Sequence, residues 1–523
     1  MKKLLAIAIL ATTALFTVSC GDDDDTQVKG SLSISGIPAN ATLTLGETLS
    51  VNNITISAED GIATFGVSVN GGAETSLLGE DFVAGSTTYT INATLGTSTL
   101  TAGNITLVFT LTDTDGDTAT FTHTLVLSNV PIVSVTGLIT GTVNWSASNI
   151  YQLNGKVVVD EGATLNIAAG TIIKGAEGEG SLASALVVAR GGTLNISGTA
   201  TAPVIFTSVQ DNIQPGQVSG SNLDKTDNGL WGGLIVLGSG RISNGAGDTF
   251  GQIEGIPADE IFGRYGYGDS DADGKPTNFQ SPMQTASSGT MTYFSIRHGG
   301  ALIGAGNEIN GLTLGGVGSG TTINYVEVVA NFDDGIEPFG GAVNISNALV
   351  WSQGDDAYDC DESYDGTITN FICISGDESD HGFEVDGPKR STHNDGVAKF
   401  RNGTFKGSQV STDGEYGDFR VAAQVNIDGL YAFNFQLGKD FEIDDDDARW
   451  IGTNPISSMT NITINTSDAL TSVFNNTDTD GTAWGTPSDF ATIVTSAPST
   501  GLADATEFAG WTFADAKGEL DDF

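Results

Sequence analysis

The sequence predicts an all-β chain, in which an N-terminal β-sandwich is followed by a parallel β-helix with a C-terminal cap. Three observations predict this fold class. Glycine makes up 70 of the 523 residues, roughly twice the share of about 7% that is usual in proteins. Short runs rich in Val, Ile and Thr alternate with Gly, Asn and Asp, which favours strands and tight turns over helices. Beyond residue 131 these runs repeat, and such repetition is typical of stacked architectures.

The chain is strongly acidic. It carries 20 Lys and Arg against 64 Asp and Glu, which gives a formal net charge of -44. A general nucleic-acid binder is excluded, because neutralising phosphates requires clustered Lys and Arg. Electrostatic docking on anionic lipid is disfavoured for the same reason. Hydrophobic residues make up 39% of the chain, which is enough for folded domains despite the charge.

The first residues predict an export signal. Lys2 and Lys3 precede the apolar stretch 4–16, which is too short to span a bilayer and suits a signal peptide, here residues 1–19. The stretch ends in Thr-Val-Ser-Cys-Gly, which resembles a bacterial lipobox with Cys20 as the lipidated residue. Acyl chains such as palmitate would anchor the mature protein stably, because each buried methylene adds about 0.8 kcal/mol. The alternative is ordinary signal cleavage beside a chance cysteine.

Residues 20–29 are predicted to form a tether that begins at the lipidated Cys20. The run Asp22-Asp23-Asp24-Asp25 resembles the acidic run that directs lipoproteins of Bacteroidota to the outer face of the outer membrane. We therefore expect a lipid-anchored protein that faces the extracellular side; the alternative is a merely solvated tether. In an oxidising setting Cys360 and Cys373 either form a disulfide or remain small buried thiols.

Residues 30–130 show short alternating strands separated by turns. This spacing over about 100 residues is typical of an Ig-like or cadherin-like β-sandwich. Asp113, Asp115 and Asp117 lie around Gly116 between the last two predicted strands. Alternating aspartates in such a turn can hold Ca²⁺ through oxygen ligands. The alternative is a hairpin turn rich in Asp and Gly.

Residues 131–482 are predicted to form the β-helix, because related segments recur at short intervals. The segment 333–337 (DDGIE) is followed 22 residues later by 355–359 (DDAYD) and 25 residues after that by 380–384 (DHGFE). In a parallel β-helix equivalent side chains stack about 4.8 Å apart, and no coil can bury its apolar face alone. A β-propeller needs roughly 40 to 50 residues per blade, so these spacings disfavour it. Residues 483–523 break the repeat and are expected to cap the open end of the stack.

Four segments carry a resemblance to a known family: GATLNI…GTIIKG, GLWGGLIVLG, EINGLTLGGVGSGTTINYVEVVANFDDGIEPFGG and GDDAYDCDESYDG. They resemble a family of Bacteroidota surface lipoproteins with a right-handed parallel β-helix of the pectin-lyase type. The resemblance covers about residues 135–523 and implies the right-handed coil. It implies no activity, and although glycan lyases and related enzymes share this architecture, a fold does not define a function.

The stacked acidic segments are the main candidate site. If the coils align as the repeat predicts, carboxylates of neighbouring coils lie within about 5 Å. Like charges so close repel unless they are protonated, separated by water or bridged by a cation, and hard oxygen ligands suit Ca²⁺. We therefore predict structural Ca²⁺ at this set of residues: Asp333, Asp334, Glu337, Asp355, Asp356 and Asp359. The alternatives are a solvated acidic face and a catalytic carboxylate cluster.

A second candidate Ca²⁺ site lies in the segment 269–274. Asp269, Asp271, Asp273 and Gly274 match the first six positions of an EF-hand loop. Gln280 stands where that loop has its bidentate glutamate, and no helical pattern flanks the segment. The prediction is a Ca²⁺-stabilised loop, with an Asp-rich turn as the alternative.

The sequence leaves two functions open. The first is a rigid non-catalytic scaffold or binding subunit that contacts a surface glycan or an outer-membrane protein complex, such as an accessory to an outer-membrane β-barrel, with Trp351 and Trp450 as contact residues. The alternative is a Ca²⁺-dependent polysaccharide lyase or a glycoside hydrolase. It would use Asp355, Asp356, Asp359 and His381, because such hydrolases need paired carboxylates. The negative field disfavours polyanionic substrates unless metals invert it.

Overall fold

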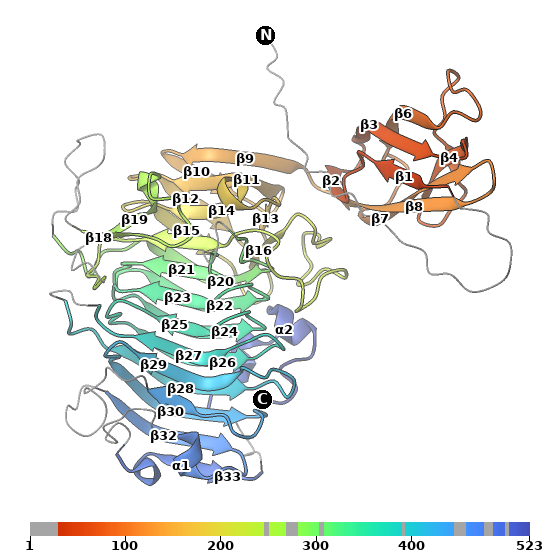
Figure 1. The fold of residues 1–523 in the computed structure, drawn as a ribbon. Helices are drawn as coiled ribbons and strands as arrows, with labels where there is room; N and C mark the ends of the chain where they lie inside the picture. The colour runs from red at the N-terminus through yellow and green to blue at the C-terminus, as the bar shows by residue number, and fades with distance from the viewer. Residues whose placement is uncertain are drawn as a thin grey trace. The chain divides into compact units, whose positions relative to one another are not determined.

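A computed structural model describes residues 30–244, 250–267, 281–302, 308–389, 393–443, 457–474, 485–496 and 502–523. The chain divides into two compact units, Met1–Val130 and Pro131–Phe523, and both consist mainly of strands (Figure 1). The all-β class is thereby confirmed. In the described parts of the chain, every helix is too short or too polar to cross a membrane.

The first unit is a β-sandwich whose two sheets enclose one apolar core. One sheet is antiparallel and has the order β1 (Leu32–Ser35), β3 (Thr48–Ala58) and β6 (Thr88–Gly96). The other has the order β2 (Asn40–Thr44), β8 (Thr118–Ser128), β7 (Gly103–Asp113), β4 (Ile62–Val69) and β5 (Thr75–Ser76). Alternate residues of β3 and β7, such as Ile54, Ile56, Leu107 and Phe109, are buried between the sheets, as the period of two in a strand requires.

The predicted Ca²⁺ turn of the first unit is held together by its own backbone. Asp113 is buried, and its Oδ1 accepts hydrogen bonds from the N–H of Asp115 at 3.1 Å and of Asp117 at 2.8 Å. Asp115 points to solvent. Within the described residues, this turn does not gather three ligand atoms. These bonds form an Asp-rich turn between the two strands, and the Ca²⁺ site at Asp113, Asp115 and Asp117 stays a prediction.

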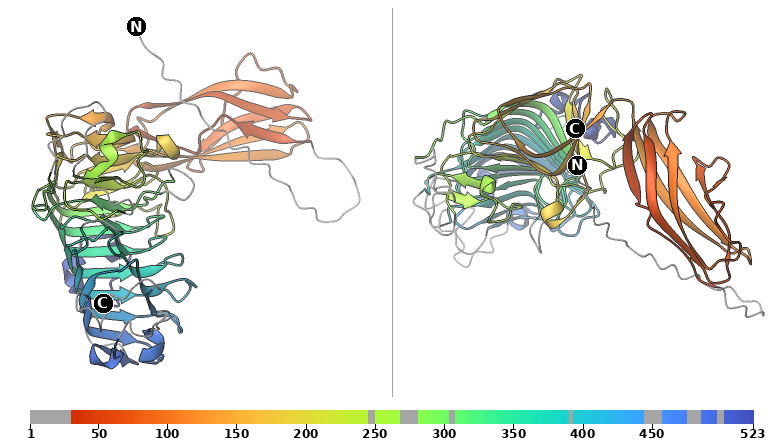
Figure 2. Two further views of the ribbon diagram at one scale, coloured as in Figure 1. Left: turned by 60° about the vertical axis from the view of Figure 1, so that its left-hand side comes forward. Right: turned by 90° about the horizontal axis from the view of Figure 1, so that it is seen from above.

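The second unit is a right-handed parallel β-helix, in which strands of successive coils pair side by side (Figure 2). The early coils use short strands, β10 (Thr142–Trp145), β12 (Thr164–Ala168), β13 (Ile172–Gly175), β15 (Thr193–Ser197) and β16 (Val204–Ser208). Later coils use long strands that span two faces, β20 (Gly289–Arg297), β22 (Thr322–Val329), β24 (Asn344–Trp351), β26 (Thr367–Ile374), β28 (Ala398–Lys406), β30 (Val425–Phe433) and β32 (Ser458–Asn465).

Asparagine explains how the long strands turn their corner. Asn347 in β24 and Asn370 in β26 have φ angles of 54° and 53°, a left-handed conformation that Asn tolerates better than most residues. Their side chains also link the coils, because Asn347 donates to Asn324 at 2.8 Å and Asn370 donates to Asn347 at 2.6 Å. In these two strands the asparagine therefore both bends the strand and joins it to the preceding coil.

The remaining face of the β-helix carries the acidic repeats. Its strands are β9 (Ile132–Ile139), β11 (Ile150–Val159), β14 (Ala185–Val188), β17 (Leu234–Leu237), β21 (Leu312–Gly315), β23 (Ile336–Phe339), β25 (Tyr358–Cys360), β27 (His381–Asp386), β29 (Glu415–Arg420) and β31 (Phe441–Ile443). Ile336 pairs with Tyr358, and Tyr358 pairs with Phe383. All three side chains are buried in one core, so the predicted alignment of the three repeats is confirmed.

Cys360 and Cys373 are separate buried thiols rather than a disulfide. Both lie in the core of the coil stack. Burial raises the pKa of Cys373 to about 12, so its thiol stays protonated. Of the two states that the sequence left open, the structure has the small apolar thiol.

The C-terminal segment covers the coil stack from the side, which differs from its expected place at the open end. The strand β33 (Ala491–Val494) pairs with β32 and continues the sheet, beside the short helix α1 (Leu470–Val473). Residues 502–523, with the helix α2 (Phe513–Ala516), return to the middle coils (Figure 1). There Phe508, Trp511 and Phe513 pack with Val329 and Leu349.

Candidate functional site

On the acidic face, one set of residues is paired in register from coil to coil, and along the stack its members change from uncharged to acidic. In the early coils the register joins Val187, Ile235 and Thr313. The next members are acidic, and each comes from the following coil; we call them the acidic row: Glu337, Asp359, Glu384, Asp418 and Glu442. Because paired strands lie about 4.8 Å apart, the row brings like charges into neighbouring positions over five coils.

The acidic row begins where an apolar cover ends. The insertion between β17 and β20 contains a hairpin of β18 (Phe250–Gln252) and β19 (Arg264–Gly266). Ile253 and Tyr265 of this insertion pack on Val187 and Ile235. Phe339 closes this apolar cluster, with its ring centroid 6.0 Å from that of Tyr265. The insertion therefore shields the apolar part of the face and leaves the acidic part beside it.

Three aspartates lie where the loops enter the acidic strands; we call Asp333, Asp355 and Asp380 the rim. Asp355 is exposed, and the other two are partly exposed. The N–H of Asp380 donates to the carbonyl oxygen of Asp355 at 2.9 Å, so these residues belong to adjacent coils. Partial burial, and then the charges of Asp356 and Asp380, raise the pKa of Asp355 to about 6. The rim thus offers an accessible carboxyl group that titrates near neutrality.

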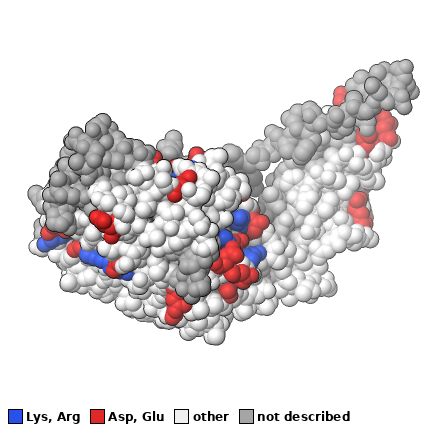
Figure 3. All heavy atoms as spheres, turned by 90° about the horizontal axis from the view of Figure 1, so that it is seen from below, with Lys and Arg blue, Asp and Glu red and all other residues white. Residues whose placement is uncertain are grey.

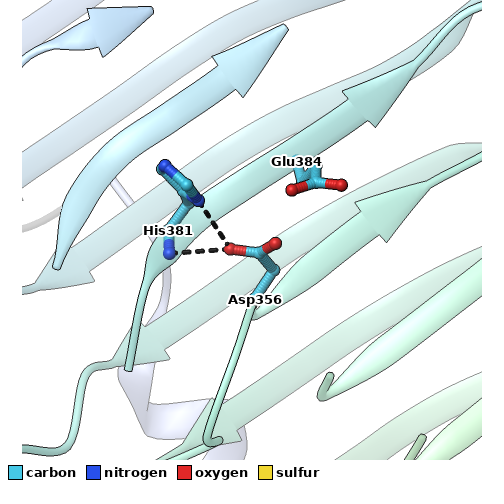
Figure 4. A group of neighbouring side chains, drawn as sticks. All are labelled: Asp356, His381 and Glu384. Carbon is cyan, nitrogen blue, oxygen red and sulfur yellow. Dashed lines mark hydrogen bonds and ion pairs between the residues drawn. The ribbon is translucent and has the colours of Figure 1, made fainter. Parts of the chain in front are cut away.

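His381 and Asp356 form an ion pair behind the rim (Figure 4). Oδ1 of Asp356 lies 2.9 Å from the ring Nδ1 of His381. The same oxygen accepts a hydrogen bond from the backbone N–H of His381 at 2.7 Å. Burial alone lowers the pKa of His381, but the hydrogen bond and the charge of Asp356 raise it to about 9. The imidazole is therefore cationic at neutral pH, and it holds Asp356 in one orientation.

The cations of the acidic face are engaged by carboxylates. Nζ of Lys389 lies 2.6 Å from Asp361 and 3.1 Å from Asp386. Arg420 pairs with Asp386 at 2.9 Å and also with Glu384. Glu384, Asp356 and His381 present ligand atoms within 4.8 Å of one another, but His381 and Arg420 already supply their positive charge. The positive charges of His381 and Arg420 make this group an ion-pair network.

Some residues predicted from the sequence do not lie on the accessible surface. Asp359, a candidate catalytic residue, is only 7% exposed and lies beneath the rim, so its catalytic role stays a prediction. Trp351, a candidate contact residue, is 2% exposed, and its ring packs 5.7 Å from that of Phe513. It cannot contact a partner, because the C-terminal segment covers it. Asp269, Asp271, Asp273, Cys20 and Trp450 lie outside the described residues.

Sequence reasoning missed residues that come from irregular coils and from the insertion. Arg420 and Asp418 belong to β29, which pairs with β27 although the two strands are separated by a long loop. The alternation in Glu-Tyr-Gly-Asp-Phe-Arg could have revealed this strand. No local signal places Tyr265 of the insertion beside Glu362.

We expect Glu362→Gln to flatten the pH dependence of stability. Burial, and then the charge of Asp361, raise the pKa of Glu362 from its ordinary value of 4.5 to about 8. The folded chain therefore keeps a proton that the unfolded chain releases, and stability falls as the pH rises through this window. Between pH 4.5 and 8, the raised pKa of Glu362 is expected to lower the free energy of unfolding of the wild type by about 4 kcal/mol at most. Denaturant unfolding over this pH range measures the change.

The control for this prediction is Asp365→Asn, which removes an exposed carboxylate that pairs with Lys399 at 2.7 Å. Surface pairs of this kind contribute little to stability. An unchanged pH slope in Glu362→Gln, or an equal change in both variants, would contradict the role given to burial.

The fold and the site together define a right-handed parallel β-helix with a carboxylate-rich face. Residues 137–515 match the pectate-lyase like beta helix domain. This match spans more than half of the chain, so the protein belongs to that family. Among solved structures, the chain is similar to the catalytic unit of a thermostable GH87 alpha-1,3-glucanase from Streptomyces thermodiastaticus strain HF3-3. The identity is 13%, the match covers 80% of this chain and 73% of that chain, and the TM-score is 0.30. No curated protein matches the sequence.

Proposed function

We propose that the protein is a glycoside hydrolase that cleaves a neutral glycan at the rim of its acidic face. The observation that carries this proposal is the pair Asp355 and Asp380, which adjacent coils hold side by side at the surface. Glycoside hydrolysis needs two carboxyl groups in different protonation states. Membership of a pectate-lyase like family is consistent with the proposal, although a shared fold does not specify a reaction.

Asp355 is the proposed general acid. Its pKa of about 6 keeps a useful fraction of the side chain protonated near neutral pH, so it can donate its proton to the glycosidic oxygen as the bond breaks. Asp380 is the proposed nucleophile. Paired strands lie about 4.8 Å apart, and carboxyl groups held at that spacing would suit a retaining enzyme, which needs a separation of roughly 5 Å.

The pair of Asp356 and His381 is proposed to position the reacting groups. Asp356 is buried and accepts from the imidazole, and Nδ1 of His381 lies 3.6 Å from Oδ1 of Asp380. Burial raises the pKa of Asp380, and the cationic imidazole at this distance opposes that shift and favours the ionised form that a nucleophile requires. His381 thereby acts through Asp380 and does not itself need to contact the substrate.

The paired state of the nearby cations favours hydrolysis of a neutral substrate. Lys389 and Arg420 are already paired with carboxylates, so a lyase at this face would need a bound metal ion to neutralise a uronate. On the face shown in Figure 3, most Lys and Arg also lie beside Asp or Glu, and large areas carry no charge. The net charge of -44 of the whole chain repels polyanions. The scaffold role predicted from the sequence has no comparable support from the described contacts.

The proposal is tested with the purified chain and a panel of neutral and uronate-containing polysaccharides. Release of reducing ends from a neutral glycan, without the ultraviolet absorbance of unsaturated uronate products, is the expected result. Elimination products would show a lyase instead. Inactivity on every neutral glycan of a broad panel would contradict the hydrolase and favour the non-catalytic scaffold role.

We also propose that Cys20 is lipidated and anchors the chain at the outer membrane, with the glycan-cleaving face outside the cell. The basic, apolar and lipobox segments of the sequence support this. Labelled palmitate should be incorporated into the wild-type chain and not into Cys20→Ala, which should leave the membrane fraction. Equal labelling of both chains would contradict the anchor.

A further inference from the structure

We propose that a Ca²⁺ ion binds beneath the rim, between Asp334, Glu337 and Asp359. Oxygen atoms of these three carboxylates lie within 4.8 Å of one another. The three side chains come from two adjacent coils, and none is more than 7% exposed. Asp334 also lies with Asp333 and Asp355 in a second group whose ligand atoms are within 4.8 Å of one another, so the site adjoins the proposed general acid.

Unpartnered oxygen atoms around this group point independently to a cation. Asn310 is 1% exposed and donates through Nδ2 to Glu337, while its Oδ1 is buried without a hydrogen-bond partner. Oδ1 of Asp359 is a second such atom. Buried acceptors without a donor cost free energy, and a cation satisfies acceptors only.

The local charge balance also favours a cation. Asp356 donates its N–H to Oδ1 of Asp334 at 2.9 Å, but no Lys, Arg or His of the described residues forms an ion pair with Asp334, Glu337 or Asp359. Nearby cations go to other carboxylates, since Lys389 binds Asp361 and Asp386. Three buried like charges without a counter-ion are unfavourable, and a divalent ion removes the repulsion.

The ligand chemistry selects Ca²⁺. All available atoms are carboxylate or amide oxygens, which suit a hard cation, whereas Zn²⁺ prefers nitrogen and sulfur. Mg²⁺ demands near-ideal octahedral geometry and keeps several waters, while Ca²⁺ accepts six to eight oxygens in flexible arrangements. A group this buried, with mono- and bidentate carboxylates available, fits Ca²⁺ better. The ion would join two coils and so stabilise the stack.

The test compares Glu337→Gln with a matched control, Glu442→Gln. Glu442 belongs to a similar group with Glu415 and Asp440, but Nζ of Lys439 lies 3.4 Å from Glu415 and supplies positive charge there. Bound Ca²⁺ is counted by elemental analysis after dialysis against CaCl₂, and the melting temperature is measured in EDTA and in CaCl₂. Because other Ca²⁺ sites are predicted in the chain, the difference between variants is the readout.

Glu337→Gln is expected to lose one equivalent of Ca²⁺ and most of the rise in melting temperature that Ca²⁺ causes in the wild type. Glu442→Gln should keep both. Asn310→Ala, which leaves all three carboxylates in place, should bind this Ca²⁺ at least ten-fold more weakly. If the carboxylates are instead protonated, Glu337→Gln will bind as much Ca²⁺ as the wild type. That result, or an equal loss in the control, would overturn the site, whereas the release of reducing ends from a neutral glycan tests the hydrolase proposal separately.

Discussion

Replacing Asp355 by Asn is expected to reduce kcat for glycan hydrolysis by roughly 10²–10⁴-fold, because Asn cannot donate the proton that the leaving oxygen needs. KM should change little, since the amide preserves the size and hydrogen-bonding capacity of the side chain. The loss of kcat without a change in KM would indicate an interaction made in the transition state. Steady-state kinetics on the neutral glycan identified from the panel provides the measurement.

The pH profile gives this prediction a second readout. A general acid must be protonated, and the pKa of Asp355 is about 6. Activity of the wild type should therefore fall as the pH rises through this value, and the residual activity of Asp355→Asn should lose this limb. Asp365→Asn serves as control, because this exposed carboxylate pairs with Lys399. An Asp355→Asn variant that keeps more than half of kcat would refute the assignment.

Replacing Glu327 by Ala is expected to destabilise the β-helix by about 3–5 kcal/mol, because it leaves a buried charge without its partner. Glu327 and Arg297 are both fully buried, with 3.5 Å between Oε2 of Glu327 and Nη2 of Arg297. Glu327 also accepts the N–H groups of Phe513 and Ala514, each at 2.9 Å. One side chain therefore neutralises Arg297 and holds the start of α2 on the coil stack.

Thermal unfolding and limited proteolysis measure this effect. The melting temperature should fall, and the segment 502–523 should become accessible to protease before the strands do. The control is Lys406→Gln, which removes partly exposed pairs with Glu519 and Asp522 on the same segment. Such pairs contribute little. Equal protease sensitivity of the two variants would contradict the anchoring role of Glu327.

The regular part of the fold could be predicted from the sequence because the repeats there are short and similar. Ile336, Tyr358 and Phe383 occupy one ladder position, and their spacing in the chain shows it directly. The C-terminal segment could not be placed, because Phe513 and Val329 are far apart in the sequence and no repeat relates them. The same cause explains Trp351, whose burial depends on that segment.

Only the gathering of acidic residues at the candidate site could be predicted from the sequence. The repeats indicated that Asp355 and Asp356 approach the residues of the next coil, and the structure places them beside Asp380 and His381. The repeats could not distinguish an exposed carboxylate from a buried one. Exposure depends on where each loop enters its strand, which places Asp355 at the surface and Asp359 beneath it. Partners such as Arg420 depend on coil pairings across long loops.

The anomeric configuration of the first cleavage product is the most direct test of hydrolysis by carboxylates held on adjacent coils. Proton NMR during the early reaction of a neutral oligosaccharide with the wild-type chain measures it. Because Asp355 and Asp380 are one coil apart, the product should retain the configuration of the substrate. Inversion would contradict this pairing, since it requires carboxyl groups roughly 6.5–9.5 Å apart.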